Sequence, residues 1–91
     1  MQRDRFAVAR TWLRSAERDV AVALLVCDAQ PALAAFHAQQ AAEKALKAVV
    51  IALTDDHART HSAGALVGEL RLLGIAFEAG VEADARALDL Y

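Results

Sequence analysis

Five polar side chains recur at short helical spacings along one uninterrupted stretch of the chain. They are His37, Gln40, Glu43, Lys44 and Lys47. Lysine ammonium groups bind phosphate as point charges. Lys44 and Lys47, with His37 and Gln40, could therefore line a small groove for a nucleotide or RNA phosphate. The other interpretation is an ion pair between Glu43 and Lys47, which lie four residues apart in the favourable order.

The only sequence cluster of metal-ligand residue types consists of Asp55, Asp56, His57 and His61. His57 and His61 would share one face only if the segment between them were helical. Thr60 and Ser62 are typical N-cap residues, which makes the preceding interval a loop. We therefore predict no metal site, and no motif for a cofactor is present.

His61 and Cys27 are the residues whose side chains could act in catalysis. His61 precedes the third predicted helix, after a loop that returns from the second, so it could lie near Gln40 and Lys47. Histidine titrates near neutral pH and can act as a general acid or base. His61 is thus the one candidate for catalysis, and a structural, hydrogen-bonded histidine is the other interpretation. Cys27 has no basic residue beside it to activate its thiol and is expected to be buried, so we predict no catalytic role.

The groove candidates lie in the strongest helix-forming part of the chain. The segment Ala32–Leu53 contains no Gly or Pro and is rich in Ala, Leu, Glu, Gln and Lys. Before it, Arg3 to about Cys27 predicts a first helix. Pro31 suits the first turn of the second helix, so the first two helices should be antiparallel neighbours.

The first predicted helix has two contrasting faces. Apolar residues at spacings of three and four predict a buried face of Phe6, Ala9, Leu13, Ala16, Val20, Ala23 and Cys27. The outer face is expected to be solvated and carries Arg3, Asp4, Arg5, Arg10, Arg14, Glu17, Arg18 and Asp19.

Two shorter helices complete the predicted fold. Thr60 or Ser62 caps the third, Gly74 ends it, and its buried face is Ala63, Leu66, Val67, Leu70 and Leu73. The fourth carries Val81, Ala85 and Leu88. The fold class is all-α, a small up-down bundle of four to five helices in one domain over residues 1–91. Its expected core includes Leu13, Val20, Phe36, Leu46, Val50, Leu66 and Leu70.

Composition narrows the classes of function. The net charge is −2, so the chain as a whole does not attract nucleic acid, and RNA binding would need a local basic patch. No apolar run approaches the ~20 residues of a membrane span, and the N-terminus lacks the apolar region of a signal peptide. A single cysteine excludes an internal disulfide and favours a cytoplasmic protein.

Three segments in this order resemble HEPN domains. They are Trp12-Leu13 followed by Ala16-Glu-Arg-Asp-Val20, then Ala34-Ala-Phe-His-Ala-Gln-Gln-Ala-Ala-Glu-Lys-Ala-Leu-Lys-Ala48, then Thr60-His61 opening a helix. The resemblance implies a helical bundle that forms a homodimer. It also implies a minimal nucleotidyltransferase as partner, in toxin–antitoxin-like or nucleotide-handling modules. The residues carried over as core or groove residues are Gln40, Glu43, Lys44, Lys47 and His61.

Many HEPN proteins are metal-independent ribonucleases with an Arg followed four to six residues later by His. No Arg precedes His37, His57 or His61 at that spacing. The Arg-Tyr-Pro type of ending common in this branch is also missing, and the domain is expected to lack the C-terminal end of the family pattern. We therefore expect a non-catalytic, dimeric HEPN subunit. The alternatives are a ribonuclease toxin with an atypical site around His61 and a plain nucleotide-binding module using Lys44 and Lys47.

Overall fold

The computed structural model describes residues 4–55 and 62–90, and these residues form an all-α fold. The described helices are α1 (Arg5–Val26), α2 (Pro31–Thr54), α3 (Ala63–Leu72) and α4 (Val81–Leu88). The predicted all-α class and the predicted number of helices are confirmed for this part of the chain. None of these helices is long and apolar enough to cross a membrane.

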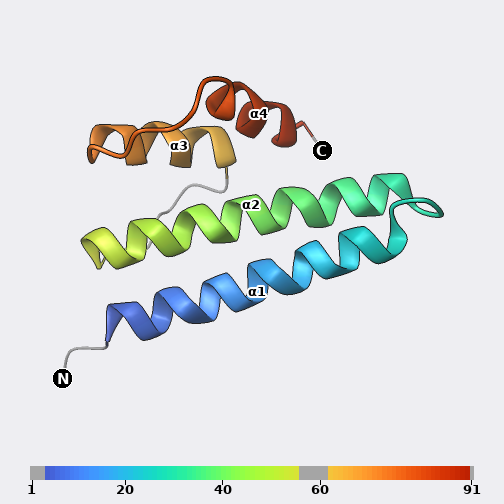
Figure 1. The fold of residues 1–91 in the computed structure, drawn as a ribbon, viewed down its shortest axis with the longest axis horizontal. Helices are drawn as coiled ribbons and strands as arrows, with labels where there is room; N and C mark the ends of the chain where they lie inside the picture. Colours follow the sequence, from blue (N-terminus) through green and yellow to red (C-terminus); the bar gives the residue numbers. More distant parts are fainter. Residues whose placement is uncertain (1–3, 56–61, 91) are drawn as a thin grey trace.

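α1 and α2 form a long antiparallel hairpin (Figure 1). Asp4 caps α1, because its side chain accepts a hydrogen bond from the Phe6 N–H at 3.0 Å. Pro31 occupies the first position of α2, where its missing N–H costs nothing. Asp55 ends α2 in a left-handed conformation, φ 57°, and its N–H donates to the Ile51 carbonyl.

α3 and α4 form a shorter hairpin that lies along α2 (Figure 1). Ser62 is confirmed as the cap of α3, since its Oγ accepts from the Ala65 N–H at 3.1 Å. Gly74 is confirmed at the left-handed stop position, with φ 95°. Leu73 was predicted to be buried, which is wrong: it is 46% exposed because it follows the last turn of α3 and leaves the face of Leu70.

The largest buried side chains lie where α2 meets α3. Val50, Leu66 and Leu70 are almost fully buried and form one cluster, so these three core predictions are confirmed. Leu46 packs at the edge of this cluster and is partly buried. A second cluster joins α3 to α4 through Ala63, Val67 and Ala85. Between α1 and α2 the buried cluster is smaller and consists of Ala9, Ala48 and Ile51.

Among the described helices, α1 contacts only α2. The prediction that Leu13, Val20 and Phe36 belong to the core is therefore wrong for the single chain, in which they are 42%, 47% and 47% exposed. The prediction that Phe6 lies on a buried face of this helix is wrong for the same reason, since Phe6 is 51% exposed. α1 turns Ala9, Ala16 and Asp19 inward. No described helix covers its neighbouring apolar stripe.

Asp89, at the end of α4, caps the beginning of α3. Its carboxylate accepts from Ser62 Oγ at 2.7 Å, from the Ala63 N–H at 2.8 Å and from the Gly64 N–H at 3.1 Å. Gly64 allows α4 to pack this closely on α3, because a Cβ there would lie 2.6 Å from Arg86 Cγ and 3.2 Å from Asp89 Oδ2. The hydrogen bond from Ser62 is the main cause that lowers the pKa of Asp89, burial opposes it, and the two backbone N–H groups add to the lowering.

Replacing Asp89 with asparagine is expected to lower the free energy of unfolding by about 1 kcal/mol at neutral pH. A carboxyl whose pKa is lowered in the folded state stabilises the protein above its ordinary pKa of 3.8. This contribution disappears as the pH falls through the lower, folded-state pKa. Urea unfolding of both proteins at a series of acidic pH values measures the difference. Asp84→Asn, at an exposed position of the same helix, is the control; a difference for Asp89→Asn that stays constant over this range would contradict the cap.

Candidate functional site

A buried carboxylate joins two of the predicted groove residues between α1 and α2. Asp19 Oδ1 accepts from His37 Nδ1 at 2.9 Å, and Asp19 Oδ2 accepts from Lys44 Nζ at 2.7 Å. Lys44 Nζ also donates to Ser15 Oγ at 2.9 Å. The structure thus brings His37 and Lys44 together through two residues of α1 that the groove prediction did not include.

The prediction that Asp19 lies on the solvated face of α1 is wrong, because this residue is buried. Asp19 follows Trp12 by seven residues and Ala16 by three, so these three share the side of α1 that faces α2. A carboxylate is stable there only because a lysine and a histidine of α2 meet it. The signal in the sequence was the i,i+4 spacing of Ser15 and Asp19 beside the inward-facing Ala16.

The charges of this group are balanced internally. Burial raises the pKa of Asp19, but hydrogen bonds from Lys44 and His37 and their charges outweigh it, so the pKa lies below the ordinary value of 3.8. Asp19 is therefore ionised at neutral pH. The Lys44 ammonium already has a carboxylate partner, and its side chain is 25% exposed. His37 is exposed to a similar degree, so both residues keep a solvent-accessible edge.

A second polar group lies further along α2. Gln39 Nε2 donates to Glu43 Oε2 at 3.0 Å, and Gln40 Nε2 donates to Gln39 Oε1 at 2.9 Å. Lys47 Nζ lies 3.1 Å from Glu43 Oε1 in the predicted i,i+4 ion pair, which is confirmed. Gln39, Glu43 and Lys47 are buried, whereas Gln40 is partly exposed.

Trp12 extends this second group to α1. The Lys47 ammonium lies 5.5 Å from the centre of the Trp12 ring, within the range of a cation–π contact. Neither Trp12 nor Gln39 was among the predicted groove residues, although the helix-forming segment and its spacings include Gln39. We call the two groups together the polar strip: Trp12, Ser15, Asp19, His37, Gln39, Gln40, Glu43, Lys44 and Lys47.

The remaining candidates fall largely outside the described residues. Asp56, His57, Thr60 and His61, and with them the prediction that His61 lies near the polar strip, lie outside the described residues. Within residues 4–55 and 62–90, no group of three or more His, Cys, Asp or Glu side chains could hold a metal ion. The prediction that Cys27 is buried is wrong: it is exposed beyond the last turn of α1.

An apolar groove of about 630 Å³ runs between α1 and α2 on the surface. Its lining is almost entirely apolar apart from Glu17. The lining residues are Leu13, Ala16, Glu17, Val20, Ala23, Leu24, Ala38, Ala41, Ala42 and Ala45. We call this surface the apolar face. It contains two of the three residues that were wrongly predicted to be core.

The HEPN domain family model matches residues 9–91 of the chain. No curated protein and no solved structure matches it.

Proposed function

The chain belongs to the HEPN domain family, and on this basis we propose that it is a HEPN subunit that dimerises through the apolar face. We further propose that it pairs with a minimal nucleotidyltransferase in a cytoplasmic toxin–antitoxin-like or nucleotide-handling module. The polar strip would then be the part of the subunit that meets a nucleotide or RNA.

The exposure of large apolar side chains carries the proposal of dimerisation. Leu13, Val20 and Leu24 are 42%, 47% and 71% exposed and follow one side of α1. A contiguous apolar surface of this kind marks an interaction site in soluble proteins. The other side of the groove is formed by alanines of α2. Because their side chains are small, the α1 helix of a second copy could approach α2 closely. A two-fold axis through the groove would place the same face of each copy against the other and cover both.

Two observations support a role of the polar strip outside this dimer contact. None of its members lines the apolar groove. His37, Gln40 and Lys44 also keep solvent-accessible edges, at which a partner or a nucleotide could accept or donate hydrogen bonds. Pairing with a nucleotidyltransferase rests on the resemblance to the family.

Replacing Leu13 with glutamate is expected to convert the dimer into a monomer. Placing two carboxylates in the centre of an apolar contact costs several kcal/mol, which weakens association by at least ~100-fold. Sedimentation velocity at micromolar concentration measures the change. Leu72→Glu is the matched control, because Leu72 is 91% exposed on α3 and lies outside the groove.

A wild-type chain that sediments as a monomer at high micromolar concentration would contradict the dimer. To test the pairing with a nucleotidyltransferase, the tagged wild-type chain is recovered from its native cell, and the proteins that co-purify with it are identified by mass spectrometry. Recovery of a small nucleotidyltransferase in near-equal amount supports the pairing. Recovery of the chain alone contradicts it, independently of the outcome for Leu13→Glu.

A further inference from the structure

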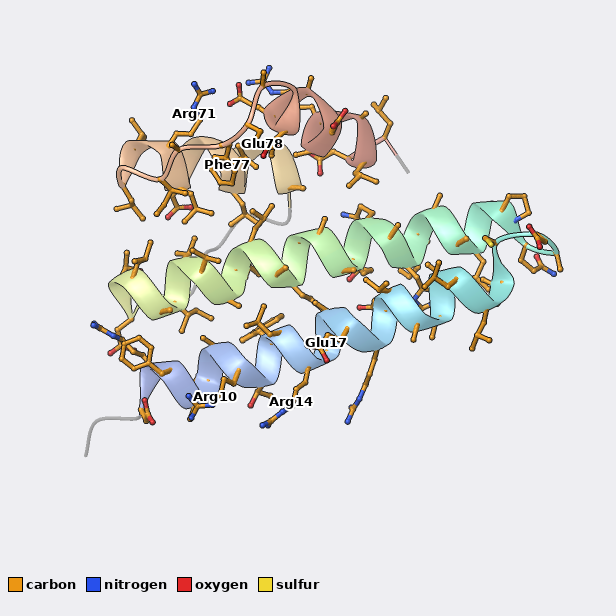
Figure 2. The ribbon with its side chains drawn as sticks, in the orientation of Figure 1. Arg10, Arg14, Glu17, Arg71, Phe77 and Glu78 are labelled. Carbon is orange, nitrogen blue, oxygen red and sulfur yellow. The ribbon has the colours of Figure 1, made fainter. Side chains whose placement is uncertain are left out.

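Three arginines form a row along the side of α1 that faces away from α2. Arg10, Arg14 and Arg18 are spaced by four residues and are all exposed. Figure 2 shows Arg10 and Arg14 on the side of α1 opposite α2. At a rise of 1.5 Å per residue, neighbouring members are separated by about 6 Å along the helix axis.

This row is not neutralised by the described part of the chain. None of the three arginines forms an ion pair with a described residue, although Glu17 lies beside them on the same helix. The lysines of the polar strip differ, since Lys44 is paired with Asp19 and Lys47 with Glu43. On the α3–α4 hairpin, Arg71 and Arg86 each pair with Glu82.

The local charge of α1 is therefore positive in a chain whose net charge is −2. α1 contains four arginines, and its only carboxylates are Glu17 and the buried Asp19, which is bound by Lys44. This is the local basic patch that the whole composition does not provide.

We infer that the arginine row of α1 binds the phosphates of a single-stranded nucleic acid. A guanidinium group matches phosphate oxygens through two parallel N–H donors, and a regular row suits an anion with charges repeated along a line. Counterion release by such contacts supplies sequence-independent affinity. The inference goes beyond the proposed function, which places contacts with a nucleotide or RNA on the polar strip and not on this row.

An aromatic side chain beside the row favours a single strand over an acidic protein surface. Phe6 lies one turn before Arg10, is 51% exposed and does not line the apolar groove. The Arg5 guanidinium lies 5.1 Å from the centre of its ring. Single-strand binding surfaces combine basic side chains with such exposed rings, on which unpaired bases stack.

The test is binding of a fluorescein-labelled single-stranded RNA of mixed sequence, about 20 nucleotides long, which exceeds the site size of a single binding module. Fluorescence anisotropy gives the affinity of the full chain across a salt series. Three phosphate contacts predict a slope of log affinity against log salt of about −2 for a single strand. The variant with Arg10→Gln, Arg14→Gln and Arg18→Gln should lose at least ~10-fold in affinity at low salt and most of this slope.

Two further variants make the test specific. Arg71→Gln with Arg86→Gln removes arginines that are paired with Glu82, and it should leave affinity and slope nearly unchanged. Phe6→Ala should lower affinity about fivefold or more at an unchanged slope, because stacking involves no counterions. If Phe6→Ala leaves the affinity unchanged, the arginine row binds polyanions in general and the assignment to a single strand is wrong.

Absence of binding by the wild-type chain at low salt, or an unchanged slope in the triple variant, would overturn the inference. Sedimentation of the triple variant separates this result from the proposed dimer. Because the three substitutions lie outside the apolar groove, the variant should sediment as the wild type does. If the triple variant loses the salt dependence of binding but sediments as the wild type does, the result supports phosphate binding by the arginine row, whatever the outcome for the dimer.

Discussion

Leu66→Ala is expected to lower the free energy of unfolding by about 3 kcal/mol, the typical cost of truncating a fully buried leucine. Leu66 is 0% exposed and lies at the centre of the cluster with Val50 and Leu70. Partly buried Leu46 and Phe77 close the sides of this cluster, so neighbours have little freedom to fill the cavity. Alanine has a helix propensity at least as high as leucine, so the loss would come from packing and not from the helix itself.

The measurement is urea unfolding followed by circular dichroism at neutral pH. The concentrations of variant and wild type must be equal, because a dimer is stabilised by mass action. For a domain of this size, such a loss also lowers the melting temperature by more than ~10 °C. Leu72→Ala is the control on the same helix, and with a side chain 91% exposed it should change the free energy by less than ~0.5 kcal/mol. Equal effects of the two substitutions would show that α3 does not pack on α2 as described.

Local signals in the sequence were sufficient to predict the helices. The first and second predicted helices end within two residues of α1 and α2, because Pro31 and the polar segment after Leu53 interrupt the pattern. Ser62 and Gly74 marked the beginning and end of α3 through hydrogen bonding and φ at single residues. Such signals depend only on near neighbours in the chain, so they can be recognised without knowing the fold.

The covered side of α1 could not be predicted in the same way. The stripe of Leu13 and Val20 and the stripe of Ala9 and Ala16 overlap on the helix, and both satisfy the spacing of a buried face. The structure turns the alanine stripe to α2 because small residues allow the two long helices to approach closely. Periodicity shows that a face is apolar, but it does not distinguish a face covered by the same chain from one that a second chain could cover.

The polar strip shows the same limit for charged residues. The ion pair between Glu43 and Lys47 was predicted from their spacing within one helix and is confirmed. The role of Asp19 depends on Lys44 and His37, which are 25 and 18 residues away in the sequence. Carboxylates are usually exposed to solvent, but one can be buried where the fold places a cation beside it. Here the antiparallel register of α1 and α2 places Lys44 and His37 beside Asp19, and the local sequence does not show that register.

Lys47→Ala is expected to lower the free energy of unfolding by about 3 kcal/mol. The side chains of Lys47 and Glu43 are 8% and 7% exposed, so both charges have left water. Removing one partner of a buried ion pair typically costs about 3–5 kcal/mol, because the other charge remains buried. The substitution also removes the cation from the Trp12 ring, whereas Gln39 still donates to Glu43 and moderates the loss.

A double variant without the two charges distinguishes this structural role from a ligand-binding role. Glu43→Gln with Lys47→Met removes both charges and keeps most of the volume, so it should recover at least half of the loss caused by Lys47→Ala. The exposed pair provides the control, since Arg71→Ala breaks its contact with Glu82 and should cost less than ~1 kcal/mol. If Lys47→Ala costs no more than Arg71→Ala, Lys47 does not stabilise the fold. Lys47 would then become the first residue of the polar strip to test for binding of a nucleotide phosphate. A large loss that the double variant recovers would instead assign Lys47 to the scaffold and leave Lys44, with its partly exposed side chain, as the lysine of the strip that meets a ligand.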